Sequence, residues 1–473
     1  MRLFALLLAA AFTAGQTMTP RLNVVFIQTD DQAPWALGLS AHPDAYTPNL
    51  DRLFRSGAHL RYSFTVTPVC SPSRASLLTS RYGSEVGITD WINPKIEPTV
   101  GLAPDTPTWS KALADAGYTN ALIGKWHLGT EDRFHPRVFG FSHFVGFRAG
   151  GTAPKDPTLE VEGQTKQVPG FEPDIFTDSA LAFIRAHRNR PFAIFLNYRS
   201  PHAPYLPVAD EDWARFKDRD VAIPNADYPD LDIEAVRKRT REYLASVAGV
   251  DRNVGRLLDA LDELQLSDRT AVIFTSDHGY NIGHNGIWHK GNGHLITRAA
   301  AALPATDPAR QRPNMFDNSL RVPTAVRWPG RIAPGTVVDE TVTNLDWYPT
   351  ILAMTGVHGL RGATIRGRSI VPLLERKRPK WDNDLYAEYS QHHYVTTELR
   401  AYRTPEWKLV RDFKNAGRDE LYHLASDPAE RRNLIDAPAA QRKRLELNEK
   451  LLQRMAAVEQ GKTERGKVKG ELD

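Results

Sequence analysis

The chain has 473 residues, of which 41% are hydrophobic and 25% are charged. This balance is typical of soluble globular proteins and excludes a fibrous repeat or extended disorder. The formal net charge of +4 is too small to indicate a nucleic-acid partner. The chain has one cysteine, Cys70, which excludes intrachain disulfides, cysteine-rich zinc sites and C-x-x-C redox pairs.

The N-terminus has the pattern of a secretory signal peptide. Arg2 precedes an apolar run from Leu3 to Ala14, and small and polar residues follow. A buried helix or a membrane anchor is the alternative, but the run is shorter than the ~20 apolar residues that a membrane span needs. We therefore predict a signal peptide over residues 1–17 and a soluble protein that is periplasmic or secreted.

Apolar runs and helical patterns alternate through most of the chain. Unbroken apolar runs predict buried strands at 23–28, 121–123, 192–196 and 271–275. Amphipathic patterns predict helices at 48–56, 109–116, 177–187 and 233–264. This alternation predicts an α/β domain over residues 20–375 with a mostly parallel sheet between helices.

A charged connector near residue 375 marks a change in the pattern. Beyond it, strand-like pieces at 404–411 and 421–424 precede a charged helical pattern from about 439 to 458. We predict a smaller C-terminal α+β subdomain over residues 376–473, with a small antiparallel sheet and a helix.

Polar clusters follow each of the four predicted strands. They are Asp30-Asp31, Gly124-Lys125-Trp126-His127, Ser200-Pro201-His202 and Ser276-Asp277-His278-Gly279. Ligands of parallel sheets bind at the carboxyl ends of the strands. The four clusters therefore predict an active site at one edge of the sheet.

Cys70 is predicted to lie at a helix N-terminus. Pro72 suits the first turn of a helix, and a helical apolar pattern follows it. The N–H groups there favour an anion, either a thiolate or a bound oxyanion, and Arg74 can add a bidentate cation. A buried, inert cysteine before an ordinary helix is the alternative.

Three carboxylates at the strand ends, from Asp30, Asp31 and Asp277, predict a metal site. Hard divalent cations prefer oxygen ligands, so Ca²⁺ is the first expectation and Mg²⁺ the second. Taken singly, Asp30 could be a helix cap and Asp277 a turn residue. A rival is zinc held by His278, His284, His289 and His294, which would leave Asp30 and Asp31 without a partner.

The motifs resemble those of the sulfatase family, in the alkaline phosphatase superfamily. The C-x-P-S-R signature is present as Cys70 to Arg74, with Leu78-Thr79 after it. Further matching segments are Asn23 to Asp31, Gly124 to Gly129, Ser200 to Tyr205, Ser276 to Gly279, Ser319 to Pro323 and Glu420 to Tyr422. The resemblance spans about residues 21–435 and implies an alkaline-phosphatase-like fold.

The resemblance implies a formylglycine-dependent, arylsulfatase-like sulfuric ester hydrolase. A maturation enzyme that reads C-x-P-x-R would oxidise Cys70 to formylglycine. One hydroxyl of the hydrated aldehyde attacks sulfur and displaces the alcohol, and the other expels sulfate from the resulting sulfate-ester intermediate.

The same resemblance implies the roles of the site residues. Calcium is bound by Asp30, Asp31, Asp277 and His278 together with the modified Cys70. Arg74 and Lys125 hold the gem-diol, and His127 is the base. His202 and Lys290 bind the sulfate oxygens and assist the leaving oxygen.

Three departures from the family pattern stand out. Ser80 replaces the usual Gly after Leu-Thr, and His278 replaces the Asn of many members. The longer segment 291–318 either shifts the position of Lys290 or forms a substrate loop. Gln391 to Tyr394 is a further candidate for the rim of the site.

Three functions remain open at this point. The first is an exported sulfatase acting on a sulfated carbohydrate. The second is a phosphonate monoester or phosphodiester hydrolase of the same superfamily. The third is a catalytically inactive protein that binds sulfated glycans and keeps Cys70 as a thiol.

Overall fold

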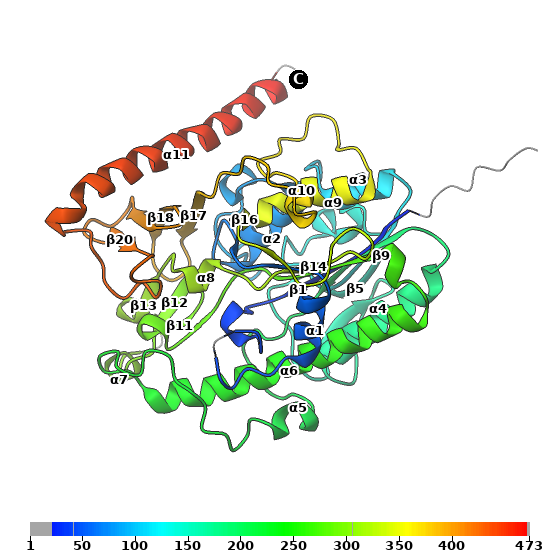
Figure 1. The fold of residues 1–473 in the computed structure, drawn as a ribbon, viewed down its shortest axis with the longest axis horizontal. Helices are drawn as coiled ribbons and strands as arrows, with labels where there is room; N and C mark the ends of the chain where they lie inside the picture. Colours follow the sequence, from blue (N-terminus) through cyan, green and yellow to red (C-terminus); the bar gives the residue numbers. More distant parts are fainter. Residues whose placement is uncertain (1–20, 41, 305, 471–473) are drawn as a thin grey trace, which may run out of the picture.

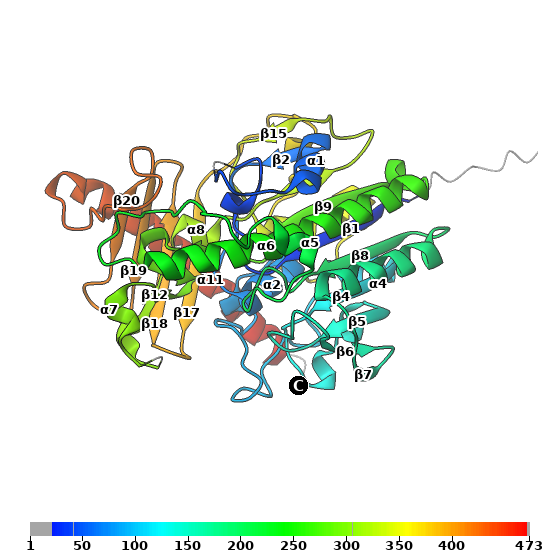
Figure 2. The same ribbon diagram turned by 90° about the horizontal axis from the view of Figure 1, so that it is seen from below.

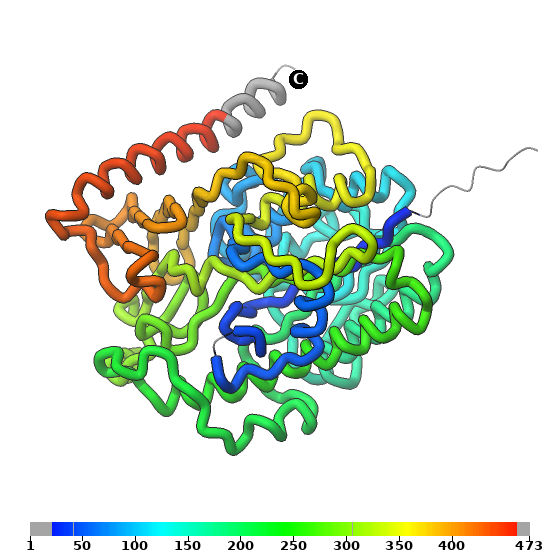
Figure 3. The backbone as a smooth tube through the Cα atoms, viewed as in Figure 1, coloured from blue at the N-terminus to red at the C-terminus, as the bar shows by residue number. Residues whose placement is uncertain are grey.

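The computed structural model describes residues 21–40, 42–304 and 306–470 (Figure 1). Figure 3 traces the course of the backbone in the same view. The predicted signal peptide, residues 1–17, lies outside the described residues. Within them, no helix combines the length and the apolar character needed to cross a membrane.

A ten-stranded sheet forms the centre of the molecule, in the order β15-β2-β14-β9-β1-β8-β4-β5-β6-β7 (Figure 1). Its strands are β1 (Asn23–Thr29), β2 (Ala58–Leu60), β4 (Thr119–Lys125), β5 (His143–Phe147), β6 (Thr158–Val161), β7 (Gln164–Gln167), β8 (Phe192–Asn197), β9 (Thr270–Ser276), β14 (Ala325–Arg327) and β15 (Thr336–Val338). The central run β9-β1-β8-β4-β5 is parallel. Antiparallel neighbours, β14 and β6, flank it. The predicted mixed, mostly parallel sheet is confirmed.

The four predicted strands are the adjacent strands β9, β1, β8 and β4. All residues of β1, β8 and β9 are buried. Strands covered on both faces need apolar side chains at successive positions, which explains their unbroken apolar runs.

Helices cover both faces of this sheet (Figures 1 and 2). One face packs against α2 (Cys70–Thr79), α3 (Trp109–Asp115), α9 (Trp347–Thr355) and α10 (Val371–Leu374). The other packs against α1 (Pro48–Ser56), α4 (Glu172–His187) and α6 (Ile233–Glu263); the short α5 (Asp210–Ala214) lies beside α6. Helix α4 begins five residues before the predicted start at 177. The prediction missed its first turn because that turn is acidic and lacks the apolar pattern.

A four-stranded antiparallel sheet forms the C-terminal region. Its strands are β17 (Leu385–Gln391), β18 (Thr397–Arg403), β19 (Trp407–Asp412) and β20 (Glu420–His423). Leu447 and Leu451 of the long helix α11 (Gln441–Gly470) pack against Leu409 and Leu421. Val66 and Val69, which precede α2, pack against other side chains of the sheet. The small β-sheet domain beside the main sheet is thus confirmed.

Two smaller sheets complete the fold. One contains β10 (Asn281–Ile282), β11 (Ile287–His289), β12 (Asn292–Leu295) and β13 (Gln311–Pro313), and the other pairs β3 (Ser63–Phe64) with β16 (Val342–Thr343). The helices near them are α7 (Arg298–Ala301) and α8 (Asp317–Leu320). Segment 291–318 supplies β12 and β13, and Lys290 lies in the turn before β12.

Candidate active site

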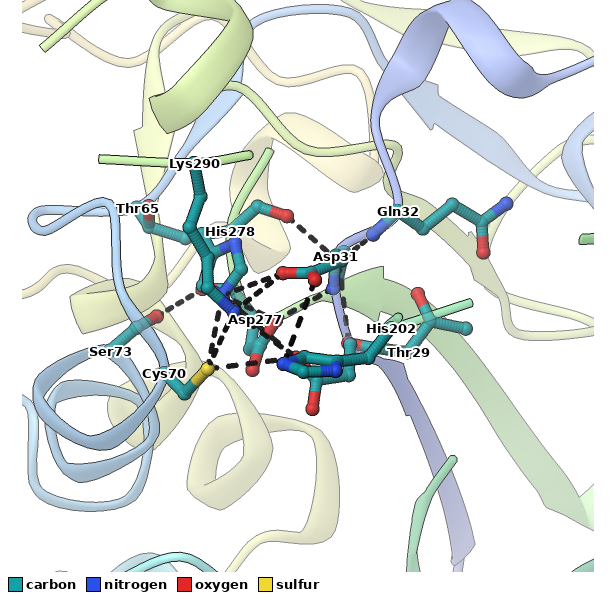
Figure 4. Close-up of polar contacts among 12 residues, drawn as sticks. Thr29, Asp31, Gln32, Thr65, Cys70, Ser73, His202, Asp277, His278 and Lys290 are labelled. Carbon is teal, nitrogen blue, oxygen red and sulfur yellow. Dashed lines mark hydrogen bonds and ion pairs between the residues drawn. The ribbon is translucent and has the colours of Figure 1, made fainter. Parts of the chain in front are cut away.

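Residues of the polar clusters after β1, β8 and β9 lie together at the carboxyl ends of these strands (Figure 4), and Lys125 at the end of β4 contacts Asp30 Oδ2. Parallel pairing aligns these strand ends, with Thr29 opposite Ser276 and Gln28 opposite Asn197. The segments that follow β1 and β9 stay hydrogen-bonded to each other: the Asp277 N–H donates to the Thr29 carbonyl at 3.0 Å. The predicted convergence at the carboxyl ends is therefore present.

Cys70 is the first residue of α2 and is buried at the centre of this cluster. Its Sγ lies 3.0 Å from Lys290 Nζ, 3.4 Å from His278 Nε2 and 3.6 Å from Asp30 Oδ1. The predicted position at a helix N-terminus is confirmed. Lys290 reaches the sulfur from the turn before β12, so segment 291–318 does not displace this lysine.

His278 and the three aspartates form a compact set of possible metal ligands. His278 Nε2 lies 3.3 Å from Asp277 Oδ1, 3.4 Å from Asp31 Oδ1 and 3.9 Å from Asp30 Oδ1. Two ligands at right angles on Ca²⁺ lie about 3.4 Å apart, given the usual metal–oxygen distances. Oδ2 of Asp31 is buried with no hydrogen-bond partner among the described residues. These residues fit a divalent cation.

Three cationic side chains pair with these carboxylates. Arg74 Nη2 lies 2.8 Å from Asp277 Oδ2, Lys290 Nζ lies 2.7 Å from Asp31 Oδ1, and Lys125 Nζ contacts Asp30 Oδ2. Repulsion among the carboxylates is therefore already offset without a metal. The case for a metal rests instead on the converging ligand atoms and on the unpartnered Oδ2.

The paired aspartates have opposite pKa shifts. Burial acts to raise the pKa of Asp30, but Lys125, His202, Lys290 and Arg74 hold it well below the usual value. Burial raises the pKa of Asp31 to about 7 despite Lys290, and the negative charge of Asp30 adds to the rise. An added cation would therefore offset the greatest electrostatic cost at Asp31.

His127 follows β4 and is linked to Ser71, the residue after Cys70, through Ile92. Its Nε2 lies 2.9 Å from the Ile92 carbonyl oxygen, and the Ile92 N–H donates to Oγ of Ser71 at 3.0 Å. Nδ1 has no hydrogen-bond partner among the described residues. Burial and the charge of Lys125 hold the pKa of His127 well below its usual value, so the ring is a neutral proton acceptor at neutral pH.

His202 lies on the open side of the cluster, beside Asp31. Its Nε2 is 3.8 Å from Asp31 Oδ2, and its ring centroid is 6.2 Å from that of His289. Burial and Lys290 hold the pKa of His202 well below its usual value. Its Nδ1 donates to the Ala203 carbonyl oxygen at 2.6 Å, so Nε2 of the neutral ring is a proton acceptor and can donate to a bound anion only after the ring gains a proton.

Backbone conformation at the site is unusual at three residues that are not glycine. Asp31, His127 and His289 have φ values of 70°, 58° and 95°. Such conformations cost of order 1–3 kcal/mol and cluster at functional sites. Gly124 has a φ of 110°, and no other residue fits at this position, because an added Cβ would lie 1.9 Å from the Asn197 carbonyl oxygen.

The structure explains one departure from the family signature. Ser80 is the C-cap of α2 with φ 57°, a left-handed conformation that favours glycine. Its hydroxyl donates to the Leu345 carbonyl at 2.7 Å and accepts from the Gly367 N–H at 2.9 Å. These bonds offset part of the backbone cost.

The rival zinc cluster is not formed by the described residues. His284 packs against Trp35 with ring centroids 5.2 Å apart, whereas His278 lies at Cys70. His294 faces Trp288 and Tyr394. The four-histidine alternative is therefore wrong.

Sequence reasoning missed Glu172, a buried residue in the first turn of α4. Its carboxylate accepts from the Arg199 N–H at 2.7 Å and from the Ser200 hydroxyl at 2.8 Å, which fixes the segment leading to His202. The only sequence signal is an acidic residue before Pro173 at a helix start.

Comparisons with known proteins agree with this geometry. The sulfatase family model matches residues 22–357, and a model of the C-terminal region of N-sulphoglucosamine sulphohydrolase matches residues 311–457. An N-acetylglucosamine-6-O-sulfatase of Bacteroides thetaiotaomicron is 26% identical, over 94% of this chain and 88% of the relative.

Solved structures share the fold. An enzyme in complex with its substrate D-glucosamine-2-N,6-O-disulfate has a TM-score of 0.79 at 24% identity, with 93% of this chain and 98% of that chain covered. The phosphonate monoester hydrolase of Agrobacterium radiobacter has a TM-score of 0.72 at 21% identity, with 93% and 96% covered. The chain belongs to the sulfatase family and is a sulfuric ester hydrolase.

Proposed function

We propose that this protein is an exported, calcium-dependent sulfatase that hydrolyses sulfate esters of carbohydrates after oxidation of Cys70 to formylglycine. The observation that carries the proposal is the position of Cys70. It begins α2 within the C-x-P-S-R signature, and its sulfur faces a lysine, an imidazole and a carboxylate. A thiol with only a packing role needs none of these partners.

Each side chain has a role set by its position. Arg74 and Lys125 hold the modified residue 70, because Arg74 donates to the Lys125 carbonyl and both pair with the aspartates around the sulfur. Neutral His127 accepts the proton that must leave residue 70 before sulfate is expelled. Lys290 and His202 bind the sulfate oxygens. His202 donates a proton toward the leaving oxygen from its protonated form, which the negative charge of a bound sulfate ester favours.

Asp30, Asp31, Asp277 and His278 would hold the metal together with residue 70. A divalent ion there would supply charge that stabilises the transferred sulfuryl group and would favour the ionised form of a hydroxyl bound to it. Calcium suits this set because three carboxylates supply hard oxygen ligands, and magnesium is the second choice.

A carbohydrate substrate is supported by the row of rings beside the anion site. His289 lies next to His202, and His294 and Tyr394 continue the row with ring centroids 5.8 Å apart at each step. Tyr394 is 49% exposed. The glucosamine-derived substrate in the name of the Bacteroides relative makes sulfated amino sugars the first compounds to test.

Two alternatives remain testable. A phosphonate monoester or phosphodiester hydrolase is supported by the fold shared with the phosphonate monoester hydrolases of Agrobacterium radiobacter and Silicibacter pomeroyi. An inactive glycan-binding protein would not need His127, whose Nδ1 is buried without a described partner.

The deciding experiment compares kcat/KM for an aryl sulfate, an aryl phosphonate and 6-O-sulfated N-acetylglucosamine, with inorganic sulfate or phosphonate measured directly. We expect the sulfate esters to be preferred. Preference for the phosphonate would favour the hydrolase alternative, and no turnover by protein carrying formylglycine would favour the binding protein.

Export and the domain boundary complete the proposal. The predicted signal peptide of residues 1–17 would direct the chain to the periplasm or the medium. A catalytic domain over residues 20–375 and a subdomain over 376–473 accord with the separate sheet that begins at Leu385. The N-terminal sequence of protein from culture medium or periplasm would test the cleavage site.

A further inference from the structure

A second cluster of possible metal ligands lies outside the catalytic residues. It contains Asp90, Glu97, His392 and His393, which we name the acid–histidine cluster. The first two belong to the segment after α2, and the histidines belong to the turn between β17 and β18. One ligand atom each from Asp90, His392 and His393 lie within 4.8 Å of one another.

Glu97 links the two histidines. Its Oε1 lies 2.8 Å from His392 Nε2, and its Oε2 lies 3.1 Å from His393 Nε2. On tetrahedral Zn²⁺, neighbouring ligands lie about 3.4 Å apart, given the usual zinc–ligand distances. Small outward movements of these three side chains would make room for the ion.

Asp90 is fixed beside this group. It accepts hydrogen bonds from the Trp91 N–H at 2.9 Å, the His392 N–H at 3.0 Å and the Tyr389 hydroxyl at 3.1 Å. Its Oδ2 lies 3.8 Å from Nδ1 of His392. The carboxylate is thus oriented before any ligand binds, which lowers the entropy cost of forming a site.

The charges of the cluster differ from those at the catalytic site. Among the described residues, neither Asp90 nor Glu97 forms an ion pair with lysine or arginine, and the two histidines are their only charge partners. Two carboxylates facing two imidazoles can be neutralised by one divalent cation. Imidazole nitrogen and carboxylate oxygen are ligands that zinc accepts.

The geometry points to a second metal site, specific for a divalent transition ion of the zinc class, formed by Nε2 of His392, Nε2 of His393 and the carboxylate of Glu97. Asp90 faces Nδ1 of His392 and orients this ring from behind the ligands. Exposure of His392, whose side chain is 48% accessible, provides an entry path. Metal binding would replace the contact between His393 Nε2 and the Trp91 carbonyl oxygen, now 2.7 Å.

The position of this site gives it a structural consequence. The ion would link the C-terminal sheet to the segment that contains Ile92, whose carbonyl lies 2.9 Å from His127 Nε2. The same residue donates to Ser71. Zinc would therefore hold in place the segment that supports the catalytic histidine. This inference does not depend on the substrate of the enzyme.

Zinc content tests the site directly. The full-length protein is dialysed against ZnCl₂ with calcium in large excess, and bound zinc is measured as free zinc is varied. We expect wild type to bind one zinc per chain that His392→Gln does not bind. Glu97→Gln should bind it at least ~10-fold more weakly, which corresponds to about 1.4 kcal/mol.

His358→Ala is the matched control, because His358 is an exposed histidine outside both clusters. It should bind zinc like wild type. Equal zinc binding by wild type and His392→Gln, or an equal loss in His358→Ala, would overturn the site. His392 is half exposed, so His392→Gln is expected to fold, and circular dichroism verifies this.

Hydrogen exchange supplies the second measurement. Zinc should slow amide exchange in residues 90–97 and 391–396 of wild type and leave His392→Gln unchanged. Protection confined to other segments would place the zinc elsewhere and contradict the assignment.

Discussion

Two clusters of buried charged side chains, one at Cys70 and one at Lys408, both pair carboxylates with cations. They differ in whether polar atoms remain available to a ligand. The catalytic cluster pairs Asp30, Asp31 and Asp277 with three cations, yet Asp31 Oδ2 and His127 Nδ1 have no hydrogen-bond partner among the described residues. It also opens toward solvent at His202, whose side chain is 22% exposed.

The Lys408 cluster, which we call the closed cluster, consists of charged side chains that pair with one another. Lys408, which is fully buried, donates to the Met315 carbonyl at 2.8 Å and to Asp317 at 2.9 Å, and it also contacts Glu430. Arg403 forms a second ion pair with Asp317 at 2.9 Å. Burial and charge alone therefore do not identify an active site. The difference is the polar atoms that remain available to a ligand.

The largest effect is expected from Cys70→Ala. This change removes the nucleophile from the open cluster, so kcat should fall on the order of 10⁴-fold or more while the fold is retained. Sulfate release and circular dichroism check the two parts. Retained esterase activity in this variant would contradict the role of residue 70.

Metal removal should also affect the open cluster strongly. Chelation should abolish most activity and lower Tm, because the ligand atoms converge on the ion only in the folded state. At 100 times Kd, bound metal contributes about 2.7 kcal/mol. Calcium should restore both quantities better than magnesium. An unchanged Tm after verified metal loss would count against these ligands.

Lys408→Met should break the closed cluster without affecting chemistry. It leaves Asp317 and Glu430 with too little positive charge in a buried position, so the free energy of unfolding should fall by about 3–5 kcal/mol. We expect kcat at low temperature to stay within about twofold, because Lys408 touches no catalytic group.

Lys443→Met is the control for that prediction. Lys443 forms an exposed ion pair with Glu446, and such pairs contribute about 0–1 kcal/mol. Denaturant unfolding of both variants measures the difference. A loss of kcat with unchanged stability in Lys408→Met would reverse the assignment of the two clusters.

The smallest effect concerns pH. The lowered pKa of His127 means that its base form persists below pH 6.5, near the ordinary histidine pKa. Activity should therefore be constant down to about pH 6.5 and fall only at lower pH, as the ring gains a proton. Tm at each pH separates this from unfolding. An acid limb at or above pH 6.5 would argue against His127 as the base.

The sequence predicted the strands and site residues whose signals are local. Strands β1, β4, β8 and β9 are apolar runs because both faces are covered. The polar residues after them follow the sheet rule for ligand sites. The outer strands were missed because β14 and β15 have only three residues each.

Residues whose roles depend on distant partners could not be found in this way. Glu172 acts through Ser200, and Asp317 pairs with Arg403 and Lys408, which are 86 and 91 residues away in the sequence. Asp90 and His392 are separated by 302 residues. Their proximity depends on how the C-terminal sheet packs near α2, which no local pattern encodes.

The mass of the tryptic peptide of residues 62–74 tests the central claim most directly. The peptide is taken from active enzyme produced with a formylglycine-generating maturation enzyme. We predict that residue 70 has lost sulfur and two hydrogens and gained one oxygen, and that the modified fraction matches the fraction of active sites. An intact thiol in protein that hydrolyses sulfate esters at full rate would contradict the account.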